Sequence, residues 1–100
     1  MPRIAHIHYR APTIEALAQL KTELGYTGAQ MADLACVAGG NQWRKYTGGH
    51  APRELGMHIA FLIAARLVLP PAQLERVFER MRTMGAEVHM SDAGTGADST

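Results

Sequence analysis

The chain has 100 residues, with ten Lys or Arg, nine Asp or Glu, one Cys and a net charge of +1. This length predicts one domain. A hydrophobic content of 47% provides enough apolar material for a core and excludes a wholly disordered chain. A single cysteine excludes an internal disulfide, so we expect a cytoplasmic protein. The chain has neither an apolar run long enough to span a membrane nor an apolar signal-peptide core at its start.

The charge is unevenly distributed along the chain. Residues 83–100 contain three acidic side chains and no Lys or Arg, which leaves a net charge of +4 over residues 1–82. Two segments, 1–14 and 34–53, contain bases but no acids. Residues 91–100 are small and polar, so we expect a disordered acidic tail there.

The first half of the chain predicts three helices. Pro12 is expected to open the first helix, whose apolar residues continue to Leu24 before Gly25 ends it. Thr27-Gly28-Ala29-Gln30 has the pattern of a capping box and predicts the start of the second helix. After the break at Gly39-Gly40, Asn41 is expected to cap a short third helix that ends at Thr47.

The second half predicts two more helices. Residues 55–69 are apolar nearly all round, which indicates a central helix buried on every side, with a dimer surface as an alternative. Pro71 starts the last helix and Gly85 ends it. Residues 4–9 and 86–90 are rich in strand formers, so a short two-stranded β element is left open. We therefore expect an all-α, compact five-helix domain over residues 1–90.

One stretch of the sequence resembles a known family. Residues 24–37, LGYTGAQMADLACV, followed by the spacing of Trp43, Tyr46 and Gly49, are similar to the Cro/CI-type (XRE) helix-turn-helix domains of bacterial and phage regulators. The similarity covers about residues 14–69. It implies a lambda-repressor-like fold in which Ala32 lets two short helices approach and the helix at 41–47 enters the DNA major groove.

The resemblance also implies a DNA-binding set. Asn41, Gln42, Arg44 and Lys45 would face the base edges, where Asn or Gln suits adenine and Arg suits guanine. The groups expected to lie at the phosphate backbone are Gln30, Thr47, Arg53, Arg3 and Arg10. Trp43 and Tyr46 are interpreted as core anchors rather than as groups that stack on bases.

The sequence patterns for metal binding and for nucleophilic catalysis are weaker. His6 and His8, with His89, do not have the spacing of a metal site, and no base is positioned beside Cys36 as a nucleophile would need. We therefore predict no enzymatic activity, cofactor or metal. The leading hypothesis is a homodimeric, repressor-like transcriptional regulator that binds double-stranded DNA. The alternative is a phage or mobile-element protein-interaction module, antitoxin-like or anti-CRISPR-like, because glycines lead the third helix and the charge is modest.

Overall fold

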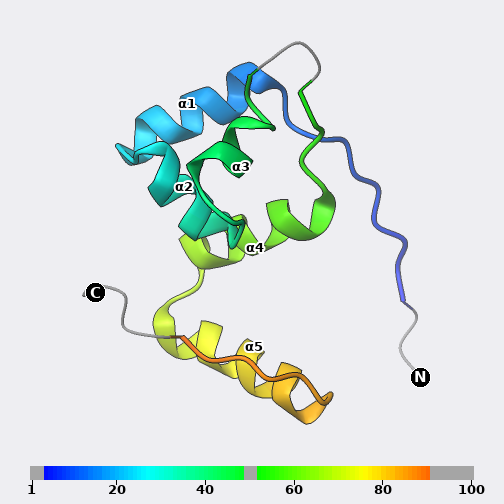
Figure 1. Ribbon diagram of the computed structural model, residues 1–100. Helices are drawn as coiled ribbons and strands as arrows, with labels where there is room; N and C mark the ends of the chain where they lie inside the picture. The colour runs from blue at the N-terminus through cyan, green and yellow to red at the C-terminus, as the bar shows by residue number, and fades with distance from the viewer. Residues whose placement is uncertain (1–3, 49–51, 91–100) are drawn as a thin grey trace. The chain divides into compact units, whose positions relative to one another are not determined.

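Five helices and no strand form in the parts of the chain that the computed structural model describes, residues 4–48 and 52–90 (Figure 1). The expected all-α class is confirmed. The two-stranded element is not seen, because residues 4–9 and 86–90 are irregular. None of these helices is long and apolar enough to cross a membrane.

The chain divides into two compact units, Met1–Leu67 and Val68–Thr100. The single domain over residues 1–90 stays a prediction, and the predicted tail at 91–100 lies outside the described residues.

Local capping sets the ends of the first helix, α1 (Ile14–Leu24). The Thr13 hydroxyl accepts a hydrogen bond from the Ala16 N–H at 3.0 Å, so Thr13 is the N-cap. The prediction that Pro12 opens the helix is therefore wrong, since Pro12 lies outside the cap. Gly25 ends the helix in the left-handed conformation at φ 67°, as expected.

The predicted capping box at the start of α2 (Gly28–Ala35) is confirmed. The Gln30 side-chain oxygen accepts from the Thr27 N–H at 2.8 Å, and the Thr27 hydroxyl accepts from the Gln30 N–H at 3.1 Å. Two N–H groups that the helix itself cannot satisfy are thereby paired.

The third helix, α3 (Gly40–Arg44), begins earlier and ends earlier than predicted. Gly39 is its N-cap at φ 155°, and the Gly39 carbonyl accepts from the Trp43 N–H at 3.0 Å. Asn41 is therefore a residue of the first turn and not the cap. Thr47 lies in the turn that follows the helix, so the predicted helix at 41–47 is wrong at both ends.

The core of the first unit lies among α1, α2, α3 and the fourth helix. Met31 and Ala32 are fully buried, and Trp43 is 1% exposed. The other buried members of this cluster are Leu17, Leu34, Ala35, Tyr46, Leu55 and Ile63. The core therefore fixes α2 and α3 through large apolar side chains.

The fourth helix, α4 (Met57–Val68), differs from the predicted helix over 55–69. Ile63 is its buried residue, whereas Phe61 is 68% exposed and Val68 is 76% exposed. The prediction of burial on every side is wrong, because the core of the first unit reaches only one side of the helix.

The second unit contains α5 (Pro71–Thr83), with Pro71 at its first turn as predicted. Leu74 and Phe78 are buried, while Val77 and Met84 are exposed. Arg82 pairs with Glu75, and its Nη1 donates to the Val88 carbonyl at 2.6 Å. This bond holds the irregular segment after α5 against the helix (Figure 1).

Candidate nucleic-acid interface

The turn between α2 and α3 is tight. Cys36 ends α2 in the left-handed conformation at φ 57°, and the Val37 N–H donates to the Ala32 carbonyl at 2.9 Å. At Gly40, a β-carbon would lie 3.4 Å from the Ala29 nitrogen. The backbone of α3 therefore begins in van der Waals contact with the first turn of α2.

Two aromatic side chains hold α3 from its inner side. Trp43 and Tyr46 are 1% and 7% exposed, and their ring centroids lie 6.1 Å apart at a tilt of 58°. The prediction that both are core anchors is confirmed. The Trp43 Nε1 is buried and has no hydrogen-bond partner among the described residues.

The residues expected to read bases lie on the opposite side of α3 or just after it. Asn41, Arg44 and Lys45 are exposed, whereas Gln42 is half-buried. The Arg44 guanidinium donates to the Asn41 side-chain oxygen. In the free chain, these two side chains therefore orient each other.

The residues expected at phosphates are more scattered. The Gln30 side-chain oxygen is used by the capping box, so that atom supports α2. Arg53 is exposed, and its backbone N–H donates to the Lys45 carbonyl at 2.6 Å, which keeps the returning chain beside the end of α3. Arg10 is exposed on the N-terminal segment, while Arg3 lies outside the described residues.

A hollow of about 340 Å³ lies where α1, α2 and α3 meet. It is lined by Ala18, Lys21, Gly28, Trp43, Arg44 and Thr47. The structure therefore brings Lys21 near two of the predicted residues, Arg44 and Thr47. Sequence reasoning missed Lys21 because it belongs to α1, and only tertiary packing places it at this site.

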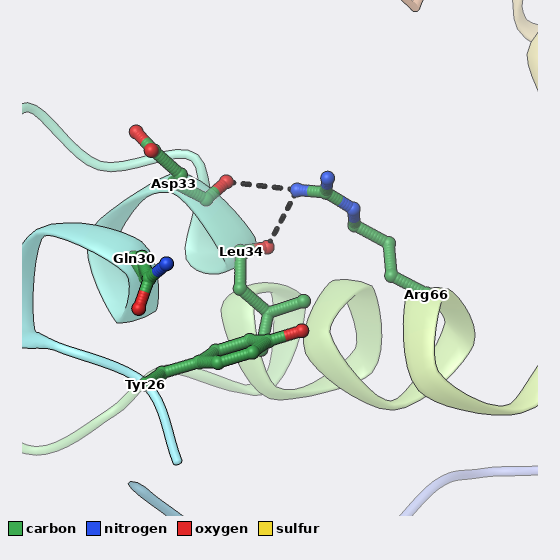
Figure 2. Close-up of a pocket in the computed structure, with 5 residues that line it drawn as sticks. All are labelled: Tyr26, Gln30, Asp33, Leu34 and Arg66. Atoms are coloured by element: carbon green, nitrogen blue, oxygen red, sulfur yellow. Dashed lines mark hydrogen bonds between the residues drawn. The ribbon is translucent and has the colours of Figure 1, made fainter. Parts of the chain in front are cut away.

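A second hollow lies beside the end of α2 and is lined by Tyr26, Gln30, Asp33, Leu34 and Arg66 (Figure 2). The Arg66 Nη1 donates to the carbonyls of Asp33 and Leu34 at 2.8 and 2.9 Å. These carbonyls belong to the last turn of α2, where a cation is favoured by the helix dipole. Arg66 therefore ties α4 to α2, a role that the sequence did not indicate.

The N-terminal segment is anchored at one point. The Tyr9 hydroxyl donates to the Leu55 carbonyl at 2.6 Å, while Ile4 and Ile7 are 90% and 75% exposed. Desolvation, together with the negative charge of Glu54, raises the pKa of Tyr9, so the hydroxyl keeps the proton that it donates.

Histidine and acidic residues do not form a cluster able to hold a metal within residues 4–48 and 52–90. Cys36 is exposed and forms no disulfide, and its Sγ accepts a hydrogen bond from the Arg66 Nη1 at 3.8 Å. Comparison of the chain with protein-family models, curated proteins and solved structures found no match.

Proposed function

We propose that this chain is a small DNA-binding transcriptional regulator of the Cro/CI-like helix-turn-helix type. The observation that carries the proposal is the two-sided construction of α3. Trp43 and Tyr46 fix its inner side in the core, and Asn41, Arg44 and Lys45 remain exposed on its outer side. A short helix held in this way can present its polar side to the major groove.

The charge of this region supports the same proposal. No acidic residue lies between Leu34 and Arg53, so the sequence around α3 carries no negatively charged side chain. Lys21, Arg44 and Thr47 line one hollow and offer two cations and a hydroxyl to a backbone phosphate. Asn41 and Arg44 are chemically suited to adenine and guanine edges.

The proposed functional form is a homodimer. One helix of five residues contacts few bases, whereas two copies read two half-sites about one turn of DNA apart. Doubling the contacts also doubles the number of phosphates neutralised, which makes binding strongly dependent on salt.

The test begins with selection from a random duplex library by the purified full chain at two salt concentrations. A palindromic sequence should be enriched, and affinity for it should fall steeply as salt rises. Arg44→Ala and Lys45→Ala should each weaken binding roughly tenfold or more, in line with a cost of about 1–3 kcal/mol per lost contact.

The matched controls are Arg76→Ala and Arg80→Ala, which remove the same charge from exposed positions on α5. They should change affinity by less than roughly threefold, the scale of exposed charge effects. Equal losses from the α3 and α5 variants would mean that only overall charge matters. Unchanged affinity in both α3 variants would overturn the proposed interface.

A protein-interaction module that uses the same fold is the second candidate. The hydrogen bond between Asn41 and Arg44 favours it, because the two side chains best suited to bases already satisfy each other in the free chain. A pull-down that gives a stoichiometric protein complex without retained DNA, and loses that complex on Lys45→Ala, would support this candidate.

A further inference from the structure

The hollow where α1, α2 and α3 meet gathers positive charge from two helices. Lys21 comes from α1 and Arg44 from α3, and Thr47 adds a hydroxyl from the turn after α3. No acidic residue lines the hollow, and neither cation forms a salt bridge within residues 4–48 and 52–90. A concave site lined by charge of one sign strengthens the local field and attracts a counter-ion. The hollow is therefore suited to an anion.

The kinds of side chain at the hollow favour a phosphate over a carboxylate. Three separate donors can each bind a different oxygen of a tetrahedral phosphate, whereas a carboxylate offers two oxygens in one plane. Lys binds phosphate as a point charge, and Thr donates its hydroxyl to phosphate oxygens. The stretch 34–53 adds further bases without an acid, which suits contact with the repeated phosphates of a nucleic acid.

The hydrogen bond between Asn41 and Arg44 determines which of their atoms are free for DNA. The Asn41 side-chain oxygen accepts from the Arg44 Nη2. An Asn that recognises adenine needs that oxygen to accept from the adenine amino group while its own amide N–H donates to the ring. With the oxygen occupied, Asn41 lacks half of that contact, whereas the other N–H groups of Arg44 remain free for a ligand. Asn41 is therefore placed to orient Arg44.

We propose that Lys21, Arg44 and Thr47 hold one phosphate of the DNA backbone, with Asn41 as the positioning residue for Arg44. The inference rests on the proposed function and deepens it by separating contacts to the backbone from contacts to bases. Arg44, for which the resemblance implies a guanine contact, contributes affinity without selecting a base. Base selection then falls to other groups of the interface, such as Lys45.

The first test needs no DNA. The unchanged full chain is titrated with inorganic phosphate while amide NMR spectra are recorded, and chloride at equal ionic strength is the reference. Phosphate should shift the signals of Lys21, Arg44 and Thr47 and leave those of α5 unchanged. Lys21→Gln should remove the shift at Thr47. Equally large shifts with acetate, or no shift at the hollow with phosphate, would overturn the proposal.

The second test compares two duplexes, the sequence enriched by selection and a scrambled duplex of the same composition. Lys21→Gln and Arg44→Gln should each weaken binding to both duplexes by the same factor, roughly tenfold. Each should also lower the slope of log affinity against log salt concentration by about one. Lys45→Gln should instead weaken binding to the enriched duplex more than to the scrambled one.

The positioning role of Asn41 is tested with and without Arg44. Asn41→Ala alone should weaken binding to both duplexes equally, by less than Arg44→Gln does. Added to Arg44→Gln, it should have no further effect, because the side chain that it orients is already gone. A further loss confined to the enriched duplex would show that Asn41 contacts a base and would overturn its positioning role.

The matched control is Lys21→Arg, which keeps a cation on α1 and should retain most of the affinity. A Lys21→Gln variant that loses thermal stability but keeps the salt slope would give Lys21 a structural role only, which overturns the shared phosphate. An Arg44→Gln variant that enriches a different sequence would do the same. Phosphate binding at the hollow without binding of any duplex would overturn the proposed function instead. Sequence-specific binding that is independent of Lys21 would overturn this inference and leave the proposed function standing.

Discussion

The outer faces of α3 and α4 belong to the same unit but have opposite chemistry. The outer face of α3 presents Asn41 and Arg44, whereas the outer face of α4 presents Phe61 and Ala64. Each helix is nevertheless anchored by buried apolar residues, Trp43 in α3 and Ile63 in α4. In both helices the buried side chains hold the helix in place. The chemistry of the exposed side decides what the helix is suited to bind.

The two faces also differ in the free energy gained when each is covered by a partner. A polar, basic face gains little by covering itself with protein, because its charges are well solvated. An uncharged apolar face gains free energy whenever it leaves water, roughly in proportion to the area covered. The face of α3 therefore suits the proposed contact with DNA, and the face of α4 suits contact with another apolar surface.

The largest expected effect is at the anchor of α3. Trp43→Ala should lower the free energy of unfolding by about 3–5 kcal/mol, because it removes a large side chain that is 1% exposed. Thermal or urea unfolding followed by circular dichroism measures the loss. Trp43→Phe should cost less because it keeps a ring in the core and also removes the unpaired Nε1.

The second prediction compares the two sides of α4. Ile63→Ala should cost about 2–5 kcal/mol, since Ile63 is 5% exposed. Phe61→Ala should change the stability of the monomer by less than about 0.5 kcal/mol, because surface substitutions without special contacts have small effects. Urea unfolding at low protein concentration checks both. Equal losses would show that Phe61 is buried in the monomer.

Local signals in the sequence were sufficient where one short segment decides the structure. The capping box at Thr27 depends on four consecutive residues, and Gly25 ends α1 through its own backbone freedom. The start of α3 was misplaced because Asn41 is a favourable cap by residue type. The chain turns instead at Gly39, which is the N-cap of α3.

Tertiary information explains what the sequence could not predict. The apolar pattern of residues 55–69 indicates burial but not the number of sides that other elements cover. In the sequence, Arg66 is an ordinary charged residue. Its hydrogen bond to the end of α2 depends on the tertiary fold. Lys21 likewise joins Arg44 only through the packing of α1 beside α3.

The third prediction concerns this tie between α4 and α2. Arg66→Met keeps the apolar stem but loses the bonds to the Asp33 and Leu34 carbonyls, so it should cost about 1–2 kcal/mol of unfolding free energy. Arg66→Lys keeps the charge and should recover part of the loss. If Met and Lys variants are equally unstable, the geometry of the guanidinium, rather than its charge, supplies the stabilisation.

The smallest expected effect is a gain in stability at Cys36, beside the same tie. Cys36 has a left-handed backbone conformation at φ 57°, where a side chain costs free energy that glycine avoids. Glycine also gives the unfolded chain more freedom, which offsets part of the gain. Cys36→Gly should therefore raise the free energy of unfolding by about 0.5 kcal/mol, and Cys36→Ala, which keeps a β-carbon, should not. A loss of stability in both variants would mean that the contact of the Cys36 Sγ with Arg66 stabilises the fold by more than the left-handed backbone conformation costs.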